Sequence, residues 1–215
     1  MGCRKAVGFY WTLPVPWAGF TALPEDIDAA ARASRTIRYQ RDAIRRHAAE
    51  NRYDLIAEKV FLEIAPDRGS EYIREPLAEA GQICRDNDAV LLFVDFSFVQ
   101  GWRSHHAMDH WARNAGLDVC PVTPDPIMMD GQSFEPDAHF VAWRKRQSEW
   151  RANKAQRVEI AFAEARKLLE DGASHHAIAD SLNERQIRSA TGKLWTRDNV
   201  AKLLAQPVAD GKSVK

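Results

Sequence analysis

Residues 89–94 read Ala-Val-Leu-Leu-Phe-Val, a run of six apolar side chains with no polar interruption. A short strand that is apolar throughout, and not only at alternate positions, is typical of a parallel sheet covered by helices on both faces. The polar residues Arg85 to Asp88 precede the run and Asp95 follows it, so its two ends are well marked. This stretch therefore predicts a buried strand at the centre of an α/β domain.

Further strands and helices are expected on either side of this run. The predicted strands are Ala6–Trp11, Tyr53–Leu62 and Leu117–Val122. The predicted helices run from about Ser34 to Asn51, from Pro76 to Cys84 and from about Ser104 to Asn114, where Gly116 provides a C-terminal cap. Residues Pro66–Ser70 are expected to form a polar loop. Strands that alternate with helices predict a doubly wound α/β fold.

Residues 121–136 contain four of the ten prolines, together with Gly131, and are expected to end the α/β domain at about residue 136. Residues 137–171 lack proline and glycine and have apolar residues at helical spacing, which predicts one long amphipathic helix or two joined helices. Ser174 and Thr196 are predicted N-caps of two further short helices, the last of which Pro207 would stop. Residues 172–215 are thus expected to form a small helix-turn-helix domain.

Charge is divided unevenly along the chain. The 215 residues carry 30 basic and 30 acidic side chains, and 15 of the basic but only 9 of the acidic ones lie in residues 141–215. A basic surplus on a helical tail is typical of nucleic-acid binding. The balanced whole chain gives no comparable reason to expect a membrane surface as partner.

Several classes of protein are not expected from this sequence. No apolar run approaches the roughly 20 residues of a membrane span, and residues 1–11 do not have the pattern of a signal peptide. The three cysteines are odd in number and form no CxxC pair, which argues against a disulfide framework and a zinc ribbon. We therefore expect a cytoplasmic protein with no membrane association, cofactor or metal.

The tail carries an ordered set of residues that matches a known domain. The matching positions are Gly172, Ser174, Ile178, Ala179, Leu182, Asn183, Glu184, Arg185, Ile187, Gly192, Trp195, Val200, Leu203, Leu204 and Pro207. In this order and spacing they resemble the DNA-binding "recombinase" domain of the serine recombinases, with Gln186 and Ser189 in place of the usual glycine and threonine. This resemblance implies that the chain binds double-stranded DNA.

The front of the chain resembles the resolvase-like catalytic domain of the same family. The matching segments are Ala6–Tyr10, Tyr39–Ile44, Pro76–Leu77 and Asp88–Asp95. The resemblance implies that residues 1–136 form the resolvase-like α/β domain and that residues 137–171 form a linker helix used for dimerisation.

The catalytic residues of that family are replaced here. In the ungapped match the nucleophilic serine falls on Leu13 and the following threonine on Pro14. Family arginines fall on Trp11, Phe96, Val99 and Glu75, and Asp95 alone matches an acidic position. Phosphoryl transfer needs a nucleophile in line and a cluster of guanidinium donors. We therefore expect a degenerate recombinase that does not cleave DNA.

An active enzyme with a relocated nucleophile is the alternative. Thr12 would be the hydroxyl in that case, and Arg4, Arg68, Arg74 and Arg103 would take over phosphate binding. Successive strand residues face opposite sides, so a shift by one residue normally carries a hydroxyl away from its site. Thr12 and Asp95 are accordingly weak catalytic candidates.

The expected DNA contacts lie on the basic tail. They are Arg144, Lys145, Arg151, Lys154, Arg188, Lys193, Arg197, Asn199 and Lys202. The last helix of such a module usually enters the major groove, which would bring Arg197, Asn199 and Lys202 to base edges. Arg188 and Lys193 precede that helix and suit phosphates or the neighbouring minor groove. A basic helix face exposed only to solvent is the alternative.

Two smaller features have competing interpretations. Phe140, Trp143 and Trp150 form an aromatic stripe that favours a homodimer interface, with packing inside one chain as the alternative. His106 and His110 have the spacing of a metal pair beside His105 and Asp109, but a solvated helix face explains them better.

The sequence as a whole predicts a DNA-binding protein that regulates transcription or recombination. An active recombinase that uses Thr12 is one alternative. A protein-interaction module without DNA binding is the other.

Overall fold

The computed structural model describes residues 3–64, 70–99 and 105–205, and within it the chain forms two compact units. The first unit consists of Met1–Pro14 with Ala22–Arg144. The second consists of Val15–Thr21 with Lys145–Lys215. The second unit is therefore built from a short N-terminal segment and the C-terminal part of the chain.

A four-stranded parallel sheet forms the centre of the first unit. Its strands are β1 (Arg4–Thr12), β2 (Tyr53–Leu62), β3 (Val90–Val94) and β4 (Val119–Val122), in the order β2-β1-β3-β4. All residues of β3 are buried, as the apolar run predicted. The predicted α/β class with a parallel sheet is confirmed.

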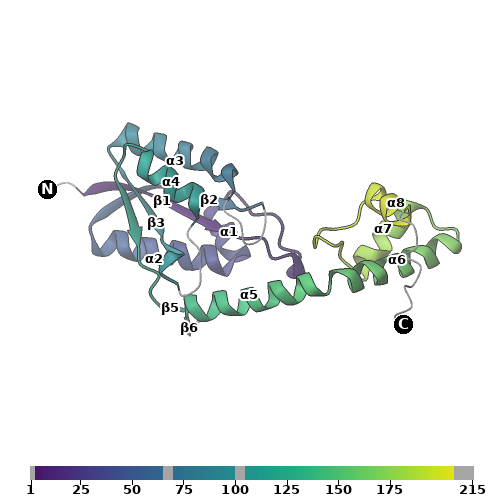
Figure 1. Ribbon diagram of the computed structural model, residues 1–215. Coiled ribbons are helices and arrows are strands. Elements are labelled where there is room, and N and C mark those ends of the chain that lie inside the picture. The colour runs from purple at the N-terminus through teal and green to yellow at the C-terminus, as the bar shows by residue number, and fades with distance from the viewer. Residues whose placement is uncertain (1–2, 65–69, 100–104, 206–215) are drawn as a thin grey trace. The chain divides into compact units, whose positions relative to one another are not determined.

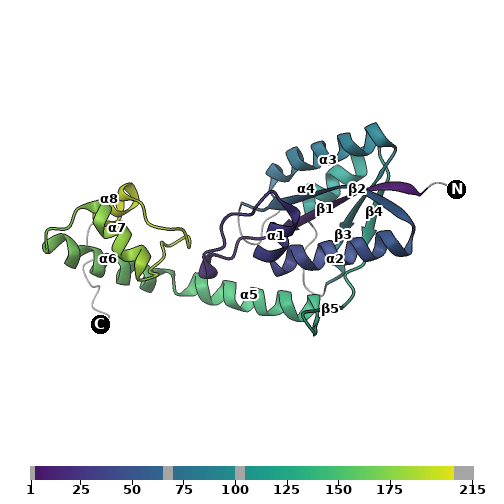
Figure 2. The ribbon, with the colours of Figure 1, turned by 180° about the vertical axis from the view of Figure 1, so that it is seen from behind.

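Helices cover both faces of this sheet (Figures 1 and 2). The helix α2 (Arg35–Glu50) lies against one face, and α3 (Arg74–Asn87) and α4 (His106–Asn114) lie against the other. A shorter helix, α1 (Ile27–Ala33), precedes α2 and packs on it, although no helix was expected there. The arrangement is doubly wound because strands alternate with helices along the chain and the helices lie on both faces of the sheet. The expected loop at 66–69 and the expected helix start at Ser104 lie outside the described residues.

On its β3 side, the carboxyl end of β1 is held by a side chain, whereas on the other side β1 pairs with β2 as far as Thr12. Pairing of β1 with β3 stops at Phe9, which faces Phe93. Beyond that point the Gln40 side chain takes over: its Nε2 donates to the Trp11 carbonyl at 2.6 Å, and its Oε1 accepts from the Trp11 N–H at 3.1 Å. Gln40 is fully buried and so completes the hydrogen bonding of the strand inside the core.

A hairpin lies within residues 121–136, where the sequence predicted only the end of the α/β domain. Strands β5 (Ile127–Met129) and β6 (Gln132–Phe134) pair antiparallel, and Asp130 and Gly131 turn between them with positive φ angles of 54° and 74°. Two successive positive φ angles are the signature of a type I′ turn, for which Asp-Gly is a preferred sequence. Arg38 of α2 fixes the turn through two bonds to Asp130, at 2.7 and 2.6 Å.

The region 137–171 forms two helices, α5 (Pro136–Ala152) and α6 (Lys154–Glu170), which meet at Asn153. Two joined helices were one of the two arrangements expected. The boundary between the compact units falls inside α5, after Arg144.

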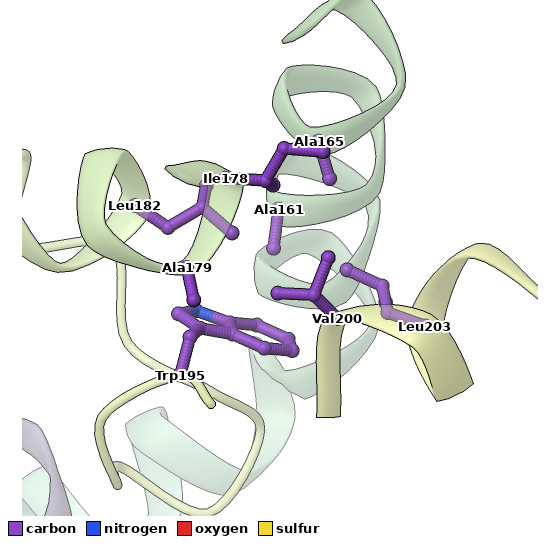
Figure 3. Close-up of a cluster of buried hydrophobic side chains, with 8 residues drawn as sticks. All are labelled: Ala161, Ala165, Ile178, Ala179, Leu182, Trp195, Val200 and Leu203. Carbon is purple, nitrogen blue, oxygen red and sulfur yellow. The ribbon is translucent and has the colours of Figure 1, made fainter. Parts of the chain in front are cut away.

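Three helices enclose the core of the second unit: α6, α7 (His175–Glu184) and α8 (Arg197–Leu204). Figure 3 shows the eight buried side chains of this core, which are Ala161, Ala165, Ile178, Ala179, Leu182, Trp195, Val200 and Leu203. The small side chains of Ala161 and Ala165 leave room for α7 to approach α6, and both are fully buried. Because α6 contributes to the core, the C-terminal module includes residues that precede the expected domain start at 172.

Candidate nucleic-acid interface

Helix α8 presents its polar side to solvent because its apolar residues are packed in the core. Thr196 caps the helix by accepting a hydrogen bond from the Asn199 N–H at 3.3 Å, as its residue type predicted. Val200 and Leu203 point inward and are buried. Arg197 and Asn199 are left exposed on the first turn.

The basic side chains at and just before α8 are available for a partner. Lys193, Arg197 and Lys202 are all exposed. Within residues 3–64, 70–99 and 105–205, no ion pair joins any of the three to an acidic side chain. Asp198 is the acidic residue on the same short helix, so α8 keeps a basic surplus. Cations that are free of internal partners can pair with phosphates without first breaking a bond.

The segment between α7 and α8 is held in place by Asn183 and Trp195. The Asn183 side chain accepts from the Trp195 N–H at 2.8 Å and donates to the Trp195 carbonyl at 3.0 Å. The Trp195 indole in turn donates to the Ile187 carbonyl at 2.8 Å. These three bonds fix the backbone immediately before α8, so the start of that helix is well positioned.

The same segment contains a tight turn at residues 189–193. The Ser189 N–H bonds to the Lys193 carbonyl at 3.0 Å, and the Gly192 N–H bonds to the Ser189 carbonyl at 2.9 Å. Gly192 has a φ of 81°, and a Cβ there would lie 2.4 Å from the Pro16 carbonyl oxygen. Only glycine suits both the backbone angle and this close approach. We name residues 188–194 the wing.

The wing makes the connection between α7 and α8 longer than a helix-turn-helix requires. That motif joins its two helices through a turn of about 3–4 residues, whereas here the connection runs from residue 185 to 196. The short turn of the module lies instead between α6 and α7, at residues 171–174, where Gly172 adopts a φ of 84° and Ser174 caps α7. The module is therefore three-helical with a wing.

The other expected DNA contacts are spread along two helices and the wing. Lys145 and Arg151 are exposed on α5, and Lys154 is exposed at the start of α6. Arg144 is half-buried. Arg188 is also half-buried, with its guanidinium beside Gly19 of the N-terminal segment that belongs to the same unit. Lys193, Arg197, Asn199 and Lys202 thus form the most accessible group of the predicted set.

The weak catalytic candidates lie at the carboxyl edge of the sheet. Thr12 is 5% exposed, and its Oγ1 accepts a hydrogen bond from the Ser34 hydroxyl at 3.3 Å. Leu13, at the position matched to the nucleophile, is 7% exposed. Asp95 caps the turn after β3 by accepting from the Ser97 N–H at 2.9 Å. Each of these residues therefore has a structural role in the first unit.

The arginines proposed to assist Thr12 are not gathered around it. Arg4 stands at the opposite end of β1, where it pairs with Asp118. Arg74, the first residue of α3, pairs with Glu71 in the short turn that precedes this helix. Arg68 and Arg103 lie outside the described residues.

A buried Glu63–His105 pair occupies the same edge of the sheet. The His105 Nε2 lies 2.9 Å from the Glu63 Oε2, and the side chains are 1% and 0% exposed. Glu63 also accepts the N–H groups of Ile64 and Ser70, at 2.8 and 2.9 Å. Burial raises the pKa of Glu63, but hydrogen bonds from His105, Ser70 and Ile64 together lower that pKa below its usual value.

His105 is not part of an accessible metal site. It is buried and caps α4 by accepting from the Met108 N–H, whereas His106 and His110 are exposed on that helix. The part of the chain that the structure describes holds no group of three histidine, cysteine or acidic side chains suited to a metal ion.

The aromatic stripe expected at a dimer interface is divided between two environments. Phe140 and Trp143 are 4% and 8% exposed within the single chain, and the Phe140 ring lies 4.9 Å from the Phe96 ring, edge to face. Trp150 is half-buried, with the Arg157 guanidinium 3.4 Å from its ring centre. Packing inside one chain accounts for the burial of Phe140, and homodimer formation stays a prediction.

Residues 144–214 match a family model described as Recombinase. The match covers about a third of the 215 residues and includes α6, the wing and α8. A comparison with curated proteins and with solved structures gave no match. Among the described helices, none has the length and apolar character needed to cross a membrane. The predicted recombinase domain is thus confirmed for the C-terminal third of the chain, and it implies DNA binding in general.

Two residues of the interface were given no role on sequence grounds. Asn183 belongs to the matched pattern, but its clamp on Trp195 joins residues twelve positions apart, as the paired hydrogen bonds reveal. Leu194 stands at an unmatched position, and nothing in the pattern indicates that it is exposed. For Asn183, the available signal was that the pattern contains both this asparagine and, twelve positions later, Trp195.

Proposed function

We propose that this chain is a DNA-binding protein of recombination or its control, in which the C-terminal module binds DNA and the α/β domain has no strand-cleaving activity. The observation that carries the DNA-binding part is the exposed group Lys193, Arg197, Asn199 and Lys202, which lies around the start of α8 inside a Recombinase-matched module. Arginine can bond guanine in bidentate fashion and asparagine can do so with adenine. The start of α8 is therefore proposed to read bases in the major groove.

The two kinds of basic residue should behave differently when removed. Arg197→Ala should relax sequence preference at one base pair and cost about 1–3 kcal/mol on the preferred duplex, because a base contact is lost. Lys193→Ala should weaken binding to all duplexes alike and lower the salt slope by about one unit, because one phosphate contact is lost. Titration against a selected and a scrambled duplex at two salt concentrations measures both quantities.

Lys167→Ala provides the matched control, since Lys167 is exposed at the far end of α6. It should leave affinity, sequence preference and salt slope unchanged. Equal affinities for wild type and Arg197→Ala on both duplexes would show that Arg197 of α8 does not read bases. Absence of salt-dependent binding by the wild type would instead favour a protein-interaction module, the second candidate class.

Absence of DNA cleavage is the second part of the proposal. The buried Leu13 at the nucleophile position and the bonded, 5% exposed Thr12 support it. Incubation with supercoiled plasmid should leave the plasmid supercoiled, and denaturing gels should show no protein linked to a 5′-phosphate. A covalent adduct on any duplex would overturn this part, and loss of that adduct in Thr12→Ala would assign it to Thr12.

The biological role follows from binding without cleavage. A protein that occupies a recombination site or a promoter without cutting it controls access by other proteins. We propose that it does so as a homodimer, since paired half-sites raise both affinity and specificity. Sedimentation of the full chain at micromolar concentration tests the dimer, and a single species of one chain would exclude it.

A further inference from the structure

Leu194 is an apolar side chain in a basic setting on the wing. It is 55% exposed, although its neighbour Trp195 is 7% exposed and part of the core. Two other apolar residues of the same module are comparably exposed, Ile160 at 49% and Leu169 at 42%. Those two stand next to glutamates in the sequence, whereas Leu194 directly follows Lys193.

The backbone around Leu194 is held firmly on both sides. Before it, the turn of the wing is closed by the bond from the Ser189 N–H to the Lys193 carbonyl. After it, the Asn183 side chain bonds to both backbone groups of Trp195. A backbone that is already fixed loses little conformational freedom on binding, so a contact made by the side chain it carries can contribute to affinity.

Leu194 also lies close to the proposed reading end of α8. It precedes the N-cap Thr196 by two residues, which limits the separation of their Cα atoms to about 8 Å. The exposed cations Lys193 and Arg197 stand on either side of it in the chain. An apolar protein surface would have to desolvate these two charges, whereas DNA offers phosphates for them.

We propose that Leu194 contacts the 5-methyl group of a thymine beside the bases that α8 reads, and so adds to sequence preference. This methyl is the apolar group that bases present in the major groove, and small apolar side chains recognise it there. The inference rests on the proposed DNA binding, since it assigns one residue of that interface a specific base feature.

Deoxyuridine substitution tests the contact directly because uracil pairs as thymine does but lacks the methyl. A duplex is first selected from a random pool by the wild-type full chain, and its thymines are then replaced one at a time. At one or two positions the wild type should bind about four-fold more weakly, which corresponds to one buried methyl group. Leu194→Ala should bind the thymine and uracil duplexes equally at those positions.

Ile160→Ala and Leu169→Ala are the controls, and both should lose affinity on uracil as the wild type does. Thermal unfolding of all variants verifies that each is folded, as expected for exposed side chains. Full thymine discrimination by Leu194→Ala, or no discrimination by the wild type at any position, would overturn the inference while DNA binding stands. A wild type that binds no duplex in a salt-dependent manner would overturn the proposed function itself, and the inference with it.

Discussion

Trp195→Ala should destabilise the C-terminal module by about 3–5 kcal/mol, the range for removing a large aromatic side chain from a core. The indole is 7% exposed among Ala179, Val200 and the other core residues (Figure 3). Its removal also deletes the 2.8 Å bond to the Ile187 carbonyl and leaves that acceptor unpaired. Because the residue fixes the wing and the start of α8, DNA affinity should fall with stability.

Denaturant unfolding monitored by circular dichroism measures the stability change, and a duplex titration measures the binding change. Trp195→Phe is the informative companion, because it keeps a ring in the core but removes the indole N–H. It should lose about 1–2 kcal/mol, most of it from the unpaired carbonyl. A Trp195→Ala protein that keeps the wild-type unfolding midpoint and DNA affinity would show that the core of Figure 3 does not hold the wing.

Glu63→Ala should lower the free energy of unfolding of the α/β domain by about 3–5 kcal/mol, because it leaves His105 buried without its hydrogen-bond partner. The carboxylate accepts from His105, Ser70 and Ile64 in a site where the Glu63 side chain is 0% exposed. Chemical denaturation at neutral pH measures the loss. Glu79→Ala removes an exposed carboxylate paired with Lys59 and should cost less than about 1 kcal/mol.

The pH dependence of this loss follows from the pKa of Glu63. The folded protein holds that pKa below the ordinary value of 4.5, so the unfolded state binds the proton first as pH falls. The stabilisation from the charged carboxylate is therefore complete well above pH 4.5 and disappears as pH falls through the folded pKa. The stability gap between wild type and Glu63→Gln should shrink over that acid range. A gap that widens there would contradict the assigned hydrogen bonds.

Patterns confined to one element were predicted well from the sequence. The apolar run at Val90–Val94 is a buried strand, and Ser174 and Thr196 cap helices through their side-chain oxygens. Each of these features depends on residues within a few positions of one another. The basic face of α8 followed in the same way, from the apolar positions Val200 and Leu203 that define the opposite side.

Features that depend on competing or distant signals were missed. Asp130-Gly131 is a strong hairpin signal, but the prolines around it indicated a domain boundary, and β5 and β6 were not expected. Helical spacing placed Phe140 on an apolar stripe and favoured a second copy as its partner, whereas its ring packs on Phe96, far earlier in the same chain. Local spacing gives the face of a helix, whereas the partner is decided by the tertiary fold.

The Gln40 side chain has a consequence for the motions of the sheet. Past Phe9, β1 no longer pairs with β3, and a sheet opens most easily where backbone groups are left unpaired. At Trp11 both backbone groups are bonded to the fully buried Gln40 of α2, so this end of β1 can open on that side only if α2 moves away from the sheet. One buried amide thereby makes local unfolding of the strand end depend on the helix that covers it.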